Sequence, residues 1–149
     1  MIEWNDSYLV GIPTVDNDHK QILKCINCFL AVLESKEGIL AIHSSFRDME
    51  RSIYRHLAVE EKMLHAVGFV HAGHHADCHA ELIEQLEEIW ENMLVNPNFS
   101  PDEPARRWLE TWLFAHVGTE DFLYRDWIFD NGREALAEEQ MSSQGGFGT

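Results

Sequence analysis

The chain has 149 residues, which fits one compact domain able to bury roughly two thirds of the surface that its unfolded form would expose. It carries 26 acidic and 11 basic side chains, and because the net charge of -15 repels polyanions we expect no nucleic-acid partner. It has no stretch of about 18 uncharged apolar residues and no basic segment at the N-terminus, so we expect no membrane insertion, no secretory signal and a cytoplasmic protein.

An ordered arm is expected at the N-terminus, over residues 1 to about 18. Trp4 and Tyr8 provide aromatic anchors in this segment, but its apolar residues have no sustained helical period. Asp16 or Asp18 would suit the N-cap of a first helix, because a short acidic side chain accepts a hydrogen bond from the free N–H groups of the first turn. The apolar residues that follow recur at helical spacing, which predicts the first helix over residues 19–35.

Three more amphipathic helices follow at short intervals. Gly38 interrupts the first pattern, and a second apolar stripe begins at Ile42 and ends near Gly68, which suits the left-handed position after a helix. The third helix is predicted over residues 70–94. The next segment is dense in turn-forming residues and cannot continue a helix, so the fourth helix begins near Pro104, a residue suited to a first turn.

The predicted fold class is all-α, because no strand-like alternation occurs in the sequence. Short connections between four long helices predict an antiparallel up-down-up-down four-helix bundle with an ordered N-terminal arm. A short C-terminal extension with further helix is expected after Asn131 and Gly132. We assign residues 1–140 to this domain and expect residues 141–149, which are rich in Ser, Gln and Gly, to be a disordered tail.

Five histidines and two carboxylates fall on the apolar stripes of these helices. In chain order they are His19, His56, Glu60, His75, His79, His116 and Asp121. His56 with Glu60 and His75 with His79 are spaced i and i+4, so each pair presents two donors on one helix face. Because charged and imidazole groups on a buried face need a compensating partner, we interpret the seven side chains as one metal centre.

The number of donors indicates two metal ions. If both carboxylates and one solvent-derived oxygen bridge two irons, and the five histidines divide three and two, one iron has six ligands and the other five. Imidazole and carboxylate donors together suit iron, whereas a structural zinc site would be closed, tetrahedral and usually rich in thiolate. A single open position on such a centre favours reversible binding of a diatomic molecule.

The segments that carry these donors resemble those of bacterial hemerythrins. The matching segments are 4–5 (WN), 10–12 (VGI), 15–20 (VDNDHK), 56–63 (HLAVEEKM), 68–69 (GF), His75-x3-His79 and Trp112-Leu113-x2-His116-Val117-x3-Asp121-x2-Tyr124. The resemblance extends over residues 1 to about 130. It implies an O2-binding protein with two non-haem irons joined by an oxo or hydroxo bridge, serving in oxygen transport, storage or sensing.

The family pattern implies a role for each donor. His75, His79 and His116 would bind the six-coordinate iron, His19 and His56 would bind the five-coordinate iron, and Glu60 and Asp121 would bridge the two. In the family, O2 binds end-on at the five-coordinate iron and is held as hydroperoxide, so NO, azide and other small anions are further candidate ligands. A dry, narrow pocket is needed for this, and we expect its apolar lining to be Leu23, Ile53, Trp112, Leu113 and Val117.

We interpret the chain as a binding protein and assign no catalytic residue. The alternative is a di-iron enzyme, either an oxidase or peroxidase or a scavenger of NO or peroxide. The Glu-x2-His repeats of ferritin-like di-iron oxygenases do not occur in this sequence, which disfavours that alternative. A third alternative, a zinc-bound or metal-free structural bundle, would be colourless and would fold normally after removal of iron.

The region before His75 offers rival histidines. His71 and His75 are also spaced i and i+4, and His74 is adjacent. The family interval after Glu60 favours His75 with His79, so we expect His71 and His74 in a loop or at the surface. His43 and His65 lie outside the helical register of the donors and are expected to face solvent.

Glu120 competes with Asp121 for the last position in the donor set. Glu120 follows His116 by four residues, the better stacked spacing, whereas Asp121 at five residues is rotated by roughly 140° in an α-helix. The resemblance favours Asp121. Gly118, between His116 and Glu120, is expected to loosen the local turn or to leave space near the metals.

The three cysteines do not form a disulfide framework, because their number is odd. Cys25 and Cys28 have the spacing of a redox or zinc pair, but they lie within a predicted helix, so helix packing is the favoured role. Cys78, next to His79, is also interpreted as a packing residue.

Overall fold

The computed structural model describes residues 1–143, and every regular element in that range is helical, which confirms the all-α class. The elements are η1 (Asp6–Tyr8, a 3₁₀ turn), α1 (Pro13–Ser35), α2 (Ile39–Val67), α3 (Ala72–Val95), α4 (Glu103–His116), η2 (Val117–Asp121, a π-helix), α5 (Phe122–Asp130) and α6 (Glu134–Ser143). None of the helices over residues 1–143 combines the length and the apolar character needed to cross a lipid bilayer.

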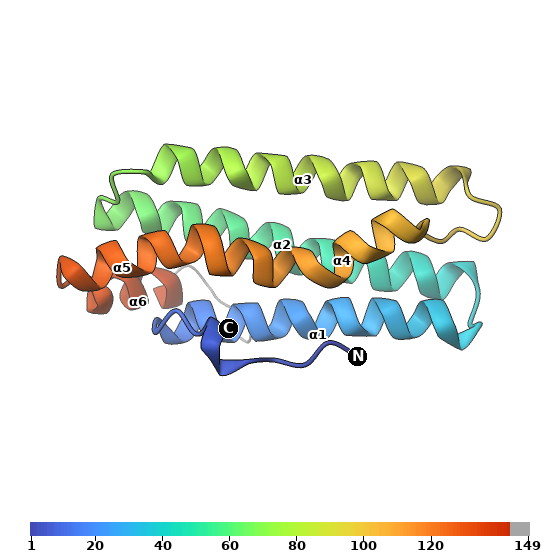
Figure 1. Cartoon of the computed structure of the whole chain (residues 1–149), viewed down its shortest axis with the longest axis horizontal. Coiled ribbons are helices and arrows are strands. Elements are labelled where there is room, and N and C mark those ends of the chain that lie inside the picture. The colour runs from blue at the N-terminus through green and yellow to red at the C-terminus, as the bar shows by residue number, and fades with distance from the viewer. Residues whose placement is uncertain (144–149) are drawn as a thin grey trace.

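The long helices lie lengthwise beside one another, and the chain reverses its direction at each connection between them (Figure 1). α4, η2 and α5 follow one another without a break and together run the length of the molecule (Figure 1). α6 folds back and contacts both α1 and α2. The N-terminal arm lies along α1, where the Asn27 side chain accepts a hydrogen bond from the N–H of Ile2 at 2.9 Å and donates one to its carbonyl at 2.8 Å.

The apolar stripes of the helices meet in one continuous core. Its largest fully buried side chains come from α1, α2, α3 and α5 and include Phe29, Phe46, Met49, Met63, Leu64, Leu86, Met93 and Tyr124. Burying a side chain of this size contributes about 1.5–3 kcal/mol. The core therefore fixes the inward faces of the helices, and these faces also carry the predicted metal donors.

The start of α1 differs from its prediction. The helix begins at Pro13 rather than at residue 19, since proline suits a first turn and its missing N–H would be unpaired there in any case. Asp16 and Asp18 lie inside the helix, so their predicted N-cap role was wrong. The Asp16 carboxylate instead accepts hydrogen bonds from the N–H groups of Val10 at 2.7 Å and Gly11 at 3.0 Å, and thereby fastens the arm to α1.

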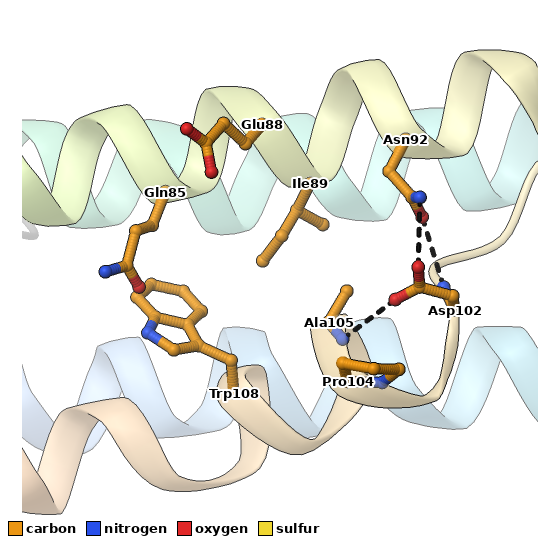
Figure 2. A pocket seen from close by; sticks show the side chains of 8 residues that line it. All are labelled: Gln85, Glu88, Ile89, Asn92, Asp102, Pro104, Ala105 and Trp108. Atoms are coloured by element: carbon orange, nitrogen blue, oxygen red, sulfur yellow. Dashed lines mark hydrogen bonds between the residues drawn. The ribbon is translucent and has the colours of Figure 1, made fainter.

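The other helix ends agree more closely with the sequence pattern. Gly68 ends α2 with a left-handed φ of 80°, as predicted. At the start of α4, the Asp102 carboxylate accepts the N–H of Ala105 at 3.0 Å and the side-chain amide of Asn92 at 3.1 Å (Figure 2). These bonds join the end of α3 to the start of α4 beside a surface hollow of about 420 Å³, which none of the predicted metal donors lines.

The C-terminal extension forms α6, which confirms the helix expected after Gly132. Ala137 and Met141 are fully buried and spaced i and i+4, so this helix packs one face on the core. The disordered tail was predicted from residue 141, and this boundary was wrong because α6 continues to Ser143. The remainder of that predicted tail, 144–149, lies outside the described residues.

Candidate metal centre

The seven predicted donors come together in the interior from four helices and the π turn. α1 contributes His19, α2 contributes His56 and Glu60, α3 contributes His75 and His79, α4 contributes His116, and η2 contributes Asp121. All seven side chains are buried. Their donor atoms form two groups within 4.8 Å, one with Glu60, His75, His79, His116 and Asp121, and the other with His19, His56 and Glu60.

Glu60 lies between the two groups and turns one oxygen to each. Its Oε1 is 2.7 Å from Nε2 of His75 and 3.1 Å from Nε2 of His79. Its Oε2 is 3.1 Å from Nε2 of His56. The carboxylate is therefore oriented as a bridge between two sets of imidazoles.

Asp121 repeats this arrangement on the opposite helix. Its Oδ1 is 3.1 Å from Nε2 of His116 and 3.2 Å from Nε2 of His75, whereas its Oδ2 is 3.2 Å from Nε2 of His19. Each carboxylate thus faces two histidines with one oxygen and a different histidine with the other. The division of the five histidines between two irons stays a prediction.

Several of these atoms make close contacts but no hydrogen bond. Nε2 of His79, Nε2 of His116 and both oxygens of Asp121 are buried without a hydrogen-bond partner in residues 1–143. An unpaired buried polar atom costs about 1–3 kcal/mol, so several in one cluster require another partner. Imidazole nitrogens and carboxylate oxygens that surround a common centre fit borderline metal ions such as iron.

Charge coupling holds the cluster together when metal is absent. Burial lowers the pKa of His56, but the Glu60 and Asp18 carboxylates outweigh this and raise it to about 10. Burial acts in the same way on His75, but the adjacent Asp121 and Glu60 carboxylates outweigh it and raise the pKa to about 10. The neighbouring imidazoles overcome the effect of burial on Glu60 and hold its pKa well below the usual range. A metal ion entering this cluster must therefore displace protons.

Comparison with known proteins identifies the family. Residues 10–128 match the model of the hemerythrin HHE cation binding domain. The chain belongs to the hemerythrin family. A bacteriohemerythrin of Pseudomonas paraeruginosa is 25% identical over 144 residues, covering 97% of this chain and 90% of the relative. A bacteriohemerythrin of Stenotrophomonas maltophilia is 23% identical over 140 residues (94% and 90%), and a myohemerythrin of Riftia pachyptila is 23% identical over 122 residues (82% and 89%).

The resemblance found in the sequence is thereby confirmed over most of the chain. A hemerythrin domain implies non-haem iron, and the buried histidines and carboxylates provide donors that suit it. Family membership and this cluster together support a di-iron protein that binds O2.

The π turn η2 explains how Asp121 enters the hemerythrin centre. Hydrogen bonds in a π-helix join residues five apart, and the N–H of Phe122 donates to the carbonyl of Val117 in this way. Asp121, five residues after His116, is therefore brought back over it, which an α-helix would not allow. Glu120 is turned outward, and its carboxylate lies 3.4 Å from Nε2 of His74.

Gly118 has a steric role within this turn. A Cβ atom at this position would lie 3.2 Å from the ring of Tyr8, closer than an ordinary contact. The absent side chain thus makes room for the N-terminal arm to pack on η2. The space that the sequence suggested near the metals is taken up by Tyr8.

Three residues that support the hemerythrin donors were not predicted. Asp18 accepts a hydrogen bond from Nδ1 of His56 at 2.9 Å, and Glu61 accepts one from Nδ1 of His79 at 3.1 Å. The Tyr124 hydroxyl donates to Oε2 of Glu60 at 2.9 Å. Such partners fix the ring orientation and leave Nε2 free for a metal. Asp18 and Tyr124 lie on buried helix faces, so their positions in the helical pattern could have indicated that they face the donors. Glu61 is half-exposed, and its position in the sequence gives no such indication.

The predicted lining of the O2 pocket lies in the hemerythrin core. Leu23, Ile53, Trp112, Leu113 and Val117 are all buried. The indole N–H of Trp112 is buried without a hydrogen-bond partner in the described part of the chain. Contact between these side chains and bound O2 stays a prediction.

The rival histidines and the cysteines lie outside the buried centre. His43, His65, His71 and His74 are exposed, as expected. The three cysteines are free thiols, and Cys28 is exposed, so its predicted packing role was wrong, whereas Cys25 and Cys78 are half-buried. Burial and the Glu120 carboxylate raise the pKa of the Cys78 thiol.

Proposed function

We propose that residues 1–140, completed by the end of α6, form a hemerythrin domain that binds O2 reversibly at a di-iron centre for oxygen carriage, storage or sensing. In this proposal the helices form the up-down-up-down four-helix bundle predicted from the sequence. The observation that carries the proposal is the double orientation of Glu60 and Asp121, since each carboxylate has one oxygen toward each group of histidines. A site for one metal ion would not need two such carboxylates.

The ligand set follows from this division. We assign His75, His79 and His116 to the six-coordinate iron, His19 and His56 to the five-coordinate iron, and Glu60 and Asp121 to both. When bound, two irons would supply the electrons and an open coordination position for O2, and we place that position beside His19 and His56, where O2 would bind end-on. NO and azide, as small ligands of the same kind, would compete for this position.

The protein's own contribution is to hold the donors and to exclude water. Asp18 and Glu61 orient the imidazoles of His56 and His79, and Tyr124 orients Glu60. Apolar side chains such as Leu113 keep the interior dry, and a water-free site slows loss of reactive species to solvent.

Metal analysis combined with optical spectroscopy tests the proposal. The purified protein should contain two irons per chain, and the spectrum of its reduced form should change on exposure to air and return when O2 is removed. Fewer than two irons per chain, or an irreversible change, would contradict a reversible O2 carrier. Steady turnover of an added reductant with O2 or peroxide would instead indicate an enzyme.

A further inference from the structure

A second cluster of metal-binding side chains lies at the surface, outside the hemerythrin centre. It consists of His74 and Cys78 on α3 and Glu120 on η2, and one donor atom from each lies within 4.8 Å of the others. The His74 side chain is 63% exposed and that of Glu120 is 23% exposed, so a dissolved cation can reach them.

The spacing of the donor atoms fits a tetrahedral ion. Nε2 of His74 is 3.6 Å from Sγ of Cys78 and 3.4 Å from Oε2 of Glu120. Zinc binds sulfur at about 2.3 Å and nitrogen or oxygen at about 2.0–2.2 Å, with tetrahedral angles. The edges of such a tetrahedron are about 3.6 Å between sulfur and nitrogen and about 3.4 Å between nitrogen and oxygen. The two separations from His74 therefore already match those that zinc would impose, and Sγ of Cys78 lies within 4.8 Å of a Glu120 oxygen.

The fold explains why these donors meet. His74 and Cys78 are spaced i and i+4 on α3, so they lie above one another on one face. The π turn that brings Asp121 inward leaves Glu120 on the outer side, facing His74. Each outer donor immediately precedes an inner one along the chain, as His74 precedes His75. The backbone that arranges the buried centre thus also arranges the outer cluster.

The surroundings favour a cation. Asp77 and Glu81 are exposed on α3 near Cys78, within a chain of net charge -15. His74 and Glu120 also line a surface hollow of about 250 Å³, which leaves room for a water ligand.

We propose that His74, Cys78 and Glu120 form a second metal site, for a borderline divalent cation of the Zn²⁺ type, with water as the fourth ligand. Three protein ligands and one exchangeable position are typical of open zinc sites. A thiolate and an imidazole select such ions over Mg²⁺ and Ca²⁺, which prefer oxygen ligands alone. This site is independent of the function proposed for the buried centre.

Titration of the iron-loaded protein with Zn²⁺ tests the proposal. Calorimetry and metal analysis should give one Zn²⁺ per chain in addition to an unchanged iron content. Cys78→Ser, His74→Ala and Glu120→Gln should each weaken Zn²⁺ binding by about tenfold or more, since even the loss of a supporting residue costs that much. Cys28→Ser and His65→Ala remove an exposed cysteine and an exposed histidine elsewhere, so they are matched controls that should leave the affinity unchanged.

Spectroscopy identifies the donor. Co²⁺ in place of Zn²⁺ should give the near-ultraviolet charge-transfer absorption of a cobalt thiolate, and Cys78→Ser should abolish it. Undiminished Zn²⁺ affinity in Cys78→Ser, the absence of Zn²⁺ binding, or release of iron on addition of Zn²⁺ would each overturn the proposal. Because the iron content is measured in the same samples, failure of the buried centre is distinguished from failure of the outer site.

Discussion

Removal of the Tyr124 hydroxyl should destabilise the protein through the Glu60 carboxylate. The hydroxyl is buried and donates to Oε2 of Glu60 at 2.9 Å, and burial together with the Glu60 and Asp121 carboxylates raises its pKa well above the usual range, so it keeps its proton. In Tyr124→Phe the ring remains to pack against Phe69 and His75, and no large cavity forms.

The magnitude follows from the chemistry of this bond. A hydrogen bond to a charged group contributes about 1.5–3 kcal/mol, and its loss leaves the buried carboxylate with one donor fewer. For a domain of this size, 1 kcal/mol shifts the melting temperature by about 2–4 °C. We therefore expect Tm of the metal-free protein to fall by roughly 3–12 °C in Tyr124→Phe. Iron affinity should fall by about tenfold, because a residue that orients a ligand is lost.

Tyr54→Phe provides a matched control. The Tyr54 hydroxyl is 3.4 Å from Oε2 of Glu50 on the half-buried face of α2, where water can replace the bond. Urea unfolding at pH 7 should show that this variant loses less than about 0.5 kcal/mol of unfolding free energy. If the two variants lost equal amounts of unfolding free energy, the hydrogen bond to Glu60 would have no special role and the reasoning would be refuted.

Three further predictions concern the buried centre. Asp121→Asn should lower the iron content per chain, measured by metal analysis, whereas Glu120→Gln should not. In the metal-free protein the pKa values of His56 and His75 are raised from 6.5 to about 10, so their contribution to stability is complete below pH 6.5 and is lost as the pH rises toward 10. Urea unfolding should record this loss, at up to about 1.4 kcal/mol per pH unit for each histidine. Leu113→Ala should lower stability by about 2–5 kcal/mol and should speed oxidation of the reduced protein by air, followed optically.

Each of these predictions has its own control and its own contrary result. Equal iron loss in Asp121→Asn and Glu120→Gln would show that the π turn does not give Asp121 and Glu120 different roles. Iron-loaded protein should not lose stability as the pH rises, since metal replaces the protons on the histidines. If the unfolding free energy of the metal-free protein did not change with pH, the charge coupling would be contradicted. Leu109→Ala opens a cavity in the core at a fully buried site one turn farther from His116, so it should cost similar stability without faster oxidation.

The sequence predicted most of the helices and the burial of six proposed donors because both depend on a local period, whereas Asp121 was chosen from the family resemblance. Apolar residues at helical spacing define the inward faces, and donors on those faces must point into the same interior. The predicted start of α1 is wrong because Asp16 accepts hydrogen bonds from the N–H groups of Val10 and Gly11 in the arm and does not cap the helix. Contacts between helices, such as that of Asp18 with His56, have no local period and could not be predicted in the same way.

At the π turn, the donor spacing that an α-helix favours differs from the spacing of the family's donor pattern, and this difference is informative. An α-helix would stack Glu120 over His116, yet the family pattern required the residue after it. One additional residue in the turn satisfies the pattern, and such single π turns within α-helices are frequent at functional sites. It also separates two adjacent carboxylates by environment, with Asp121 buried among imidazoles and Glu120 at the surface beside His74. A mismatch between helical spacing and a donor pattern therefore predicts a local change in helix type, and the residue displaced outward by that change becomes available for a second role.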